Sequence, residues 1–192
     1  MAQPNPEQPR ESSAAIARAL RVVGRFGAPA RRIFEAWLDP ALARRWLFAT
    51  AAHPLAGVEI DARPGGSFRL VDVRDGSSVT YAGRYVAIVP NRRLIFTLAL
   101  PQRRDVATRV TVEVDALGSR STMTLLHENV PSDLAALVRA RWTGMFYGLG
   151  LLLDSSFPSR LESFDDPHCR FRAAPIDYNV GPSRFTITRS ER

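Results

Sequence analysis

A long apolar stretch near residue 140 limits what this chain can fold into more than any other feature. Between Ser132 and Asp154, large apolar residues recur at steps of three and four, which places them on one side of a helix. Ser132 is expected to cap this helix, with Asp133 in its first turn. A helix of this length runs about 30 Å, the width of a small domain. Its apolar side comprises Leu134, Val138, Trp142, Met145, Leu149 and Leu152, widened by Phe146 and Leu153.

Strand-like segments joined by turns fill most of the chain before this helix. Two short helices interrupt them after the first strand, and Asp39 is expected to cap the second helix with Pro40 at its first position. The residues between 101 and 105 are expected to form an exposed basic loop. The order predicts an α+β fold in which a curved antiparallel sheet of six to seven strands surrounds the long helix. The strands are expected at residues 19–26, 58–61, 67–74, 79–89, 94–100, 108–114 and 122–128.

The composition predicts one domain with two tails. A chain of 192 residues with 45% hydrophobic residues is long enough for one ordinary core. Residues 1–16 are rich in Pro, Gln, Ser and Glu, and residues 155–192 are interrupted by prolines. We therefore expect a disordered N-terminal segment at 1–16, a folded domain at 17–154, and a mostly disordered C-terminal tail at 155–192.

Targeting and membrane signals are absent from the sequence. The N-terminus has no apolar core of a signal peptide, and no run reaches the roughly 18 to 20 apolar residues that span a bilayer. Cys169 is the one cysteine, so no disulfide framework exists. These features indicate a cytoplasmic protein without a membrane span.

The formal net charge of +7 does not indicate nucleic-acid binding. A nucleic-acid site would gather arginines on one element with aromatic residues between them. Here the Arg pairs at 31–32, 44–45, 92–93 and 103–104 belong to different expected elements. The chain contains no Lys, which together with its many Ala residues suggests a GC-rich, bacterial genome.

The sequence contains no recognisable catalytic motif. It lacks the nucleophile elbow, the zinc-protease motif, the phosphate-binding loop and the dinucleotide fingerprint. The three histidines, His53, His127 and His168, are far apart and none is paired with a second metal ligand. The sequence predicts no catalytic residue, no metal site and no cofactor.

His127 is the polar residue that stands out. By strand alternation it shares a face with Met123 and Leu125, which should face the long helix. It is either a strand-end histidine satisfied by a backbone carbonyl or a ligand contact. Tyr81 and Tyr85 share one face of the central hairpin, but the pattern does not decide whether that face lines a cavity.

Other residues are candidates for lining a cavity between the sheet and the helix. Trp46 and Phe48 end a short helix near a loop, which is a plausible pocket mouth. Gly148 flanks the apolar side of the long helix and allows either close packing or space for a ligand. The long helix itself supplies Trp142, Met145, Phe146 and Leu149.

Three blocks carry a family resemblance. They are APARRIFEAW at 28–37, followed by LDP at 38–40 and Trp46; GRYVAIVPNRRLIFT at 83–97; and TMTLLHE at 122–128. Their order and the helix after them resemble the START-like (SRPBCC) superfamily, in the branch similar to the C-terminal domain of the activator of heat-shock protein 90 ATPase. The resemblance covers about residues 17–154.

Two positions depart from the family pattern. Arg141-Trp142 stands where members commonly have Gly-Trp, and Leu98 replaces an aromatic residue often found after the central hairpin strand. Both departures are expected to alter the shape of the cavity more than the fold. The resemblance itself implies the helix-grip fold of birch-pollen-allergen-like proteins and an internal hydrophobic cavity.

The resemblance leaves three classes of function open, since one fold hosts many functions. The first is binding of a small hydrophobic molecule, with a regulatory or stress-related outcome. The second is a module that binds a chaperone-like protein partner. The third is a cyclase-like or hydrolytic enzyme using His127 and a cavity tyrosine, for which no residue spacing argues. We favour the first class.

Overall fold

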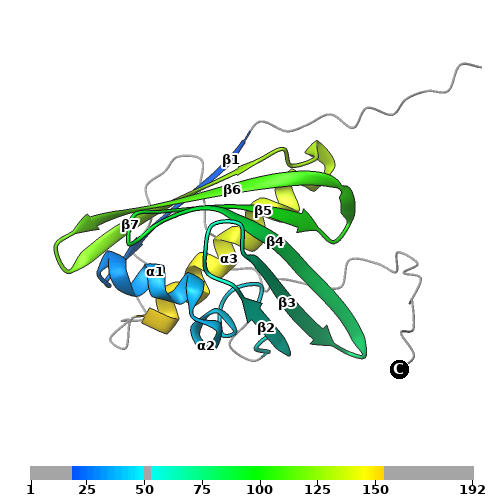
Figure 1. The fold of residues 1–192 in the computed structure, drawn as a ribbon, viewed down its shortest axis with the longest axis horizontal. Coiled ribbons are helices and arrows are strands. Elements are labelled where there is room, and N and C mark those ends of the chain that lie inside the picture. Colours follow the sequence, from blue (N-terminus) through cyan, green and yellow to red (C-terminus); the bar gives the residue numbers. More distant parts are fainter. Residues whose placement is uncertain (1–18, 50–52, 154–192) are drawn as a thin grey trace, which may run out of the picture. The chain divides into compact units, whose positions relative to one another are not determined.

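The computed structural model describes residues 19–49 and 53–153. The two tails expected to be disordered, 1–16 and 155–192, lie outside the described residues. The described part forms a curved antiparallel sheet that wraps around a long helix, with two short helices after the first strand (Figure 1). This is the α+β helix-grip fold that the sequence predicts.

In the described part of the chain, seven strands form the sheet in the order β1-β7-β6-β5-β4-β3-β2. Strands β2 to β7 follow one another as a meander, whereas β1 pairs with the distant β7, with Val22 opposite Leu125. All neighbouring strands are antiparallel. The strands are β1 (Leu20–Phe26), β2 (Gly57–Ile60), β3 (Ser67–Arg74), β4 (Ser77–Val89), β5 (Arg93–Leu100), β6 (Arg103–Leu117) and β7 (Arg120–Glu128).

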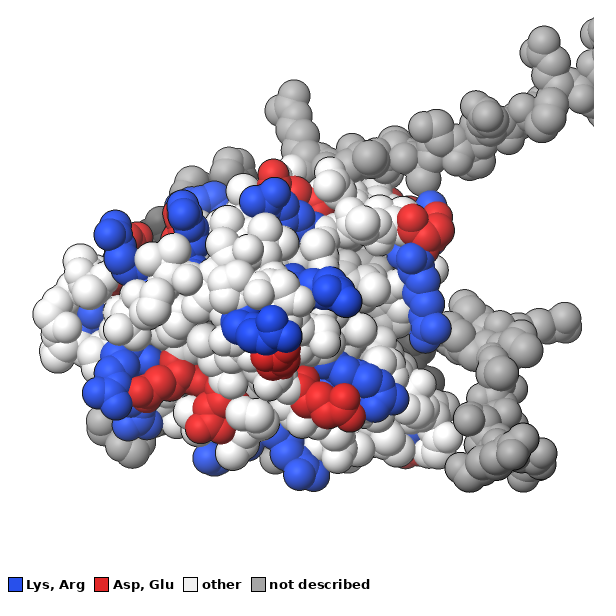
Figure 2. Space-filling model, in the orientation of Figure 1, with Lys and Arg blue, Asp and Glu red and all other residues white. Residues whose placement is uncertain are grey.

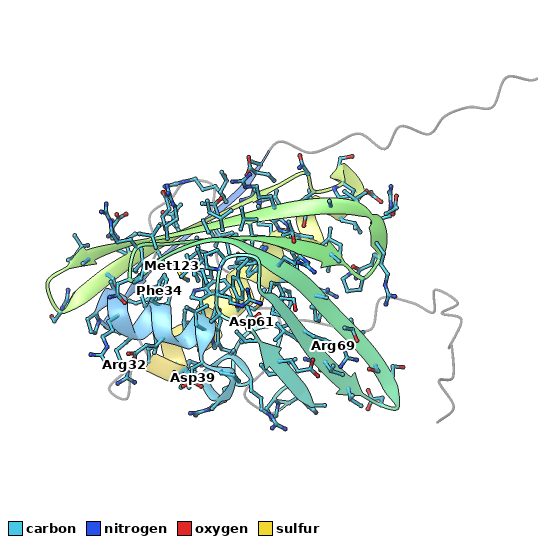
Figure 3. All side chains as sticks on the ribbon, in the orientation of Figure 1. Arg32, Phe34, Asp39, Asp61, Arg69 and Met123 are labelled. Atoms are coloured by element: carbon cyan, nitrogen blue, oxygen red, sulfur yellow. The ribbon has the colours of Figure 1, made fainter. Side chains whose placement is uncertain are left out.

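The short helices lie on the side of the sheet that faces the long helix (Figure 1). Helix α1 (Ala30–Leu38) places Phe34 toward the sheet, where Met123 of β7 also points inward (Figure 3). Helix α2 (Pro40–Ala43) begins as predicted, because the carboxylate of Asp39 accepts the backbone N–H of Ala41 at 2.7 Å.

The long helix starts differently from the prediction. Residues Ser132–Leu134 form a 3-10 turn, η1, and helix α3 runs from Ala135 to Leu153. The turn arises because Pro131 fixes the backbone and its carbonyl accepts the N–H of Leu134 at 3.0 Å, an i to i+3 bond. The prediction that Ser132 caps an α-helix is therefore wrong. The predicted apolar side is confirmed, since Val138, Trp142, Met145, Phe146 and Leu149 are buried.

The basic loop expected at residues 101–105 is also not a loop. A two-residue turn follows Leu100, and β6 already begins at Arg103. The strand begins here because Arg103 pairs with Leu100 of β5, and the extended backbone places Arg103 and Asp105 on one face, where they bind at 3.2 Å. The β5–β6 hairpin is consequently longer than the sequence pattern suggests.

The central hairpin turns its tyrosine face inward, which the sequence left undecided. Tyr81 and Tyr85 are 6% and 5% exposed, and Gly83 lies between them on β4. A Cβ atom on Gly83 would lie 1.8 Å from the carbonyl oxygen of Thr97 and 2.6 Å from the ring of Phe68. Glycine is therefore required where β4 crosses β5 closely.

Charged side chains are dispersed over the surface. On the face shown in Figure 2, arginines are interspersed with acidic residues. Several form surface ion pairs, such as Arg63 with Asp61 at 3.0 Å and Arg69 with Glu59 at 3.6 Å. Among the described helices, none is both long enough and apolar enough to cross a membrane.

Alanine substitutions at Gly83 on β4 and at Gly148 on α3 give a matched test of the fold. Gly83→Ala should lower the free energy of unfolding by at least roughly 1–3 kcal/mol, because the new methyl group meets fixed backbone. Gly148→Ala should raise it by about 1 kcal/mol, because helix propensity improves and the nearest atom, Cβ of Trp46, is 3.9 Å away. Urea denaturation of both variants measures this, and equal effects would contradict the close approach of β4 and β5.

Candidate functional site

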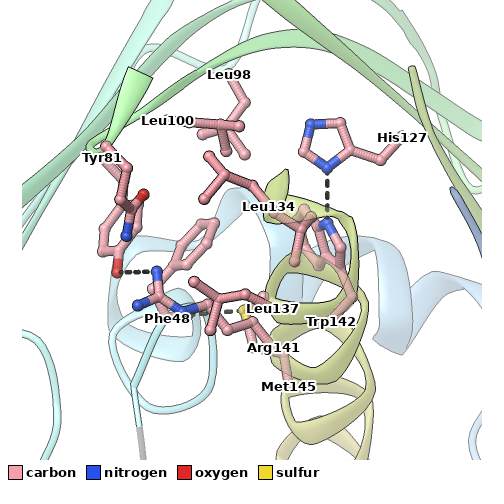
Figure 4. Close-up of a pocket in the computed structure, with 12 residues that line it drawn as sticks. Phe48, Tyr81, Leu98, Leu100, His127, Leu134, Leu137, Arg141, Trp142 and Met145 are labelled. Carbon is pink, nitrogen blue, oxygen red and sulfur yellow. Dashed lines mark hydrogen bonds between the residues drawn. The ribbon is translucent and has the colours of Figure 1, made fainter. Parts of the chain in front are cut away.

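A small cavity lies between α3 and the strands β4, β5 and β7 (Figure 4). Its volume is about 20 Å³, enough for about one water molecule. Almost all of its lining is apolar, and the polar groups are those of four residues, Tyr81, Gln102, His127 and Arg141. The remaining lining residues are Phe48, Leu98, Leu100, Leu134, Leu137, Val138, Trp142 and Met145.

A second cavity of about 10 Å³ lies under the short helices. Its lining is aromatic and aliphatic, and it includes Tyr85. Phe48 lines both cavities. Phe48 is the one residue common to the two linings, so the two cavities lie on either side of it. The other lining residues of the second cavity are Trp37, Leu47, Ile60, Phe68, Leu70 and Phe96.

Phe48 holds this position with an unusual backbone. Its φ angle is +54°, in the left-handed region that non-glycine residues rarely adopt. Its N–H donates to the sulfur of Met145 at 3.0 Å. Its ring stacks on Tyr81, with centroids 4.0 Å apart and planes 12° apart, and lies 5.6 Å from the ring of Trp142. The ring of Phe48 thus fills the space between β4 and α3.

His127 belongs to a chain of hydrogen bonds that crosses the interior. The indole N–H of Trp142 donates to Nδ1 of His127 at 3.0 Å (Figure 4). Because Nδ1 accepts, the proton of a neutral ring is on Nε2, which donates to the hydroxyl of Thr108 at 2.8 Å. The Thr108 hydroxyl in turn donates to the carbonyl of Leu98. The neutral ring satisfies every group in this chain.

Burial lowers the pKa of His127 to about 4. The hydrogen bonds also lower this pKa, because a protonated Nδ1 of His127 would point its N–H at the N–H of Trp142. The sequence left open a backbone carbonyl partner or a ligand contact. The structure gives side-chain partners instead, because Thr108 and Trp142 lie on neighbouring elements. Both ring nitrogens are engaged, so His127 offers no free base.

Polar groups also meet at the outer end of the first cavity. The guanidinium of Arg141 donates to the hydroxyl of Tyr81 at 3.3 Å (Figure 4). Gln102 lines the same cavity. Deeper in the sheet, burial raises the pKa of the Tyr85 hydroxyl, which therefore stays protonated. An apolar chamber with a few convergent polar groups is typical of small-molecule sites.

The candidate residues from the sequence fall into three groups in the structure. Five line the first cavity, and two, Tyr85 and Phe48, line the second, so that Phe48 belongs to both. Trp46 is fully buried in the core, where its indole N–H donates to the carbonyl of Ala36 at 2.9 Å, so it is not at a pocket mouth. Phe146 packs on Phe26 instead, with ring centroids 6.0 Å apart. Those at the first cavity are Phe48, Tyr81, His127, Trp142 and Met145; Trp46, Phe146, Gly148 and Leu149 line neither.

Sequence reasoning missed several lining residues. Leu100 ends β5, in a segment that was expected as a strand, and Gln102 lies in the β5–β6 turn, which was expected to be an exposed loop. Leu137 lay outside the expected apolar side of the long helix. Arg141 and Leu98, the two departures from the family pattern, both line the first cavity. Helical spacing links Leu137, Arg141 and Met145, four residues apart, and was the signal that could have found them.

No metal site is evident among the described residues, where His, Cys, Asp and Glu side chains do not gather in groups of three or more. The polar side chains of the first cavity supply hydrogen-bonding groups and the Arg141 charge.

The hydrogen-bond chain predicts a specific loss of stability in acid. The unfolded pKa of His127 is about 6.5 and the folded pKa is about 4, so the unfolded chain binds more protons between these values. His127 therefore contributes its full stability above pH 6.5 and loses it as the pH falls toward 4. The wild type should lose roughly 2–3 kcal/mol more than His127→Gln between pH 7.5 and 4.5 in urea denaturation.

His127→Gln is the matched control, because an amide can accept from Trp142 and donate to Thr108 without titrating. Parallel pH profiles for the two proteins would show that His127 is not buried as a neutral ring.

The comparisons with known proteins agree with this architecture. The family model of the activator of Hsp90 ATPase homolog 1-like protein matches residues 27–154. No curated protein matches the sequence.

Many solved structures share the fold. One is protein CV1439 from Chromobacterium violaceum, at 24% identity and a TM-score of 0.62, covering 70% of this chain and 96% of that chain. Another, from Rhizobium leguminosarum, has 27% identity and a TM-score of 0.57 over 71% of this chain and 93% of that chain. Protein MLL2253 from Mesorhizobium loti, at 18% identity and a TM-score of 0.61, covers 73% of this chain and 100% of that chain. With its fold and two thirds of its length matched, the chain belongs to the activator of Hsp90 ATPase homolog 1-like protein family, within the START-like superfamily.

Proposed function

We propose that this domain binds one small hydrophobic molecule between α3 and the sheet, in the space that the ring of Phe48 fills. The observation that carries the proposal is that Phe48 is the one residue that lines both cavities. With the ring displaced, these spaces would join into one chamber lined by aromatic and aliphatic side chains. Family membership supports the same function, because the fold typically encloses a ligand.

The cavities as they stand are too small for such a ligand. Their volumes are about 20 and 10 Å³, whereas ligand sites typically reach roughly 300–1,000 Å³. Binding therefore requires the interior to open. Phe48 is the residue best placed to move, because it lies in the connection between α2 and β2, outside any helix or strand.

The backbone of Phe48 lowers the cost of that movement. A non-glycine residue in the left-handed region costs about 1–3 kcal/mol, which is regained when the residue relaxes. The ring loses its stack on Tyr81, a contact of about 0.5–1.5 kcal/mol beyond area burial. The backbone strain released and the stacking energy lost are of similar size. A ligand that stacks on Tyr81 in the same way can therefore displace the ring of Phe48.

Binding of a chaperone-like protein is the second candidate, and it rests on the description of the family. Helix α3 carries two half-exposed apolar residues one turn apart, Tyr147 and Leu151, which could contribute to a protein contact. A regulatory role, in the cytoplasm of a bacterium, is compatible with either kind of partner.

Catalysis has less support from the geometry. The enzyme hypothesis required His127 and a cavity tyrosine to act on a substrate. Both nitrogens of His127 form internal hydrogen bonds, and burial raises the pKa of Tyr85. Neither His127 nor Tyr85 is prepared to exchange a proton with a ligand at neutral pH, and the hydroxyl of Tyr81 accepts a hydrogen bond from Arg141 at 3.3 Å.

Removing the Phe48 ring tests the proposal. Phe48→Ala should join the cavities and leave space of the order that binds an aromatic ring, since an engineered cavity of about 150 Å³ in another protein binds benzene. Naphthalene should bind this variant at least tenfold more tightly than the wild type. Isothermal titration calorimetry measures the affinities, and quenching of Trp142 fluorescence reports the location.

Phe26→Ala is the matched control, because Phe26 is a buried phenylalanine that lines neither cavity. A similar gain of naphthalene affinity in Phe26→Ala would indicate general loosening of the core. No binding to either the wild type or Phe48→Ala would overturn the proposed function.

A further inference from the structure

Arg141 is the feature of the site that a purely apolar ligand does not explain. It lines the first cavity, where it supplies the one formal charge among the lining residues. Its side chain is half-buried, and its one described hydrogen bond goes to the neutral hydroxyl of Tyr81. Within the described ranges, no carboxylate forms an ion pair with Arg141, whereas Arg31 and Arg103 pair with Glu35 and Asp105.

The chemistry of this group favours an anion. A guanidinium presents five N–H donors in a planar fork that matches the two oxygens of a carboxylate. Such charge-assisted pairs are roughly twice as strong as neutral hydrogen bonds, and more so when partly removed from water. The Tyr81 hydroxyl accepts from Nη1 of Arg141, which leaves other donors of the fork to meet a ligand.

The register of α3 directs Arg141 to the cavity. Leu137 and Met145, one turn before and after it, line the same cavity, and Trp142 beside it is buried. Arg141 therefore lies within an apolar wall, between Leu137 and Met145. A ligand along this wall would have an apolar body inside and its polar group at Arg141.

Tyr81 links the charge to the aromatic space. Its hydroxyl is 3.3 Å from Arg141, and its ring carries the stacked ring of Phe48 at 4.0 Å (Figure 4). A flat ring that replaced Phe48 on Tyr81 would thus lie next to the guanidinium. A carboxylate one or two atoms away from that ring would be within reach of it.

We infer that the ligand is an aromatic monocarboxylate, with its ring stacked on Tyr81 in place of Phe48 and its carboxylate bound by Arg141. This inference rests on the proposed function and names its ligand class. One guanidinium neutralises one carboxylate, whereas a dianion such as a phosphate monoester would bring a second charge into an apolar lining.

A matched pair of probes tests the charge. 2-Naphthylacetic acid and 2-naphthylacetamide have nearly the same shape, but only the acid is anionic at pH 7.5. The wild type should bind the acid at least tenfold more tightly than the amide in isothermal titration calorimetry. Arg141→Gln should abolish this preference by lowering the affinity for the acid, while the affinity for the amide should stay within about twofold of the wild-type value.

Arg139→Gln is the control for overall charge. Arg139 lies on the same helix and loses the same charge, but it is exposed and binds the carbonyl of Arg21 at 3.0 Å. This variant should keep the wild-type preference for the acid. An equal loss of acid affinity in both variants would assign the effect to the general positive field and overturn the inference.

The remaining outcomes separate this inference from the proposed function. If the wild type binds the acid and the amide equally, the site takes apolar molecules without a charge requirement, and only the carboxylate inference fails. If the wild type binds neither probe, both fail.

Discussion

The hydrogen bond from Trp142 to His127 fixes how the long helix sits in the sheet. It joins the middle of α3 to β7, and Thr108 and Leu98 extend the connection through β6 to β5. None of these groups can be left without a partner, because an unpaired polar group in the interior costs about 1–3 kcal/mol. The rotation of α3 is therefore set, and with it the positions of Arg141 and Met145 on the cavity wall.

Side chains pack closely around this hydrogen-bond chain, and the candidate site is filled by protein side chains. The ring of Phe48 occupies the interior between Tyr81 and Trp142, held by a strained backbone and by the sulfur of Met145. A ligand would exchange one aromatic ring for another without rebuilding the core. The walls of the site belong to β4 and α3, whereas Phe48 belongs to a connecting segment. Displacement of Phe48 would therefore leave the hydrogen-bond chain of His127 in place.

Most of the fold could be predicted from the sequence because its signals are local. Alternation defined the strands, three- and four-residue spacing defined α3, and Asp39-Pro40 defined the start of α2. Several features that the sequence left open are decided by partners distant along the chain. The pairing of β1 with β7 and the inward face of Tyr81 depend on contacts across the sheet. The partners of His127 lie 15 and 19 residues away, and nothing in the pattern near Phe48 indicates a left-handed backbone at a phenylalanine.

A crystal structure of the domain with bound 2-naphthylacetate tests most directly whether Phe48 yields its place to a ligand. The naphthyl ring should lie on Tyr81, the Phe48 side chain should have moved out of the interior, and its φ angle should have left the left-handed region. The hydrogen bond between Trp142 and His127 should be unchanged. A naphthyl ring bound on the surface, with Phe48 still stacked on Tyr81, would contradict an interior site gated by Phe48.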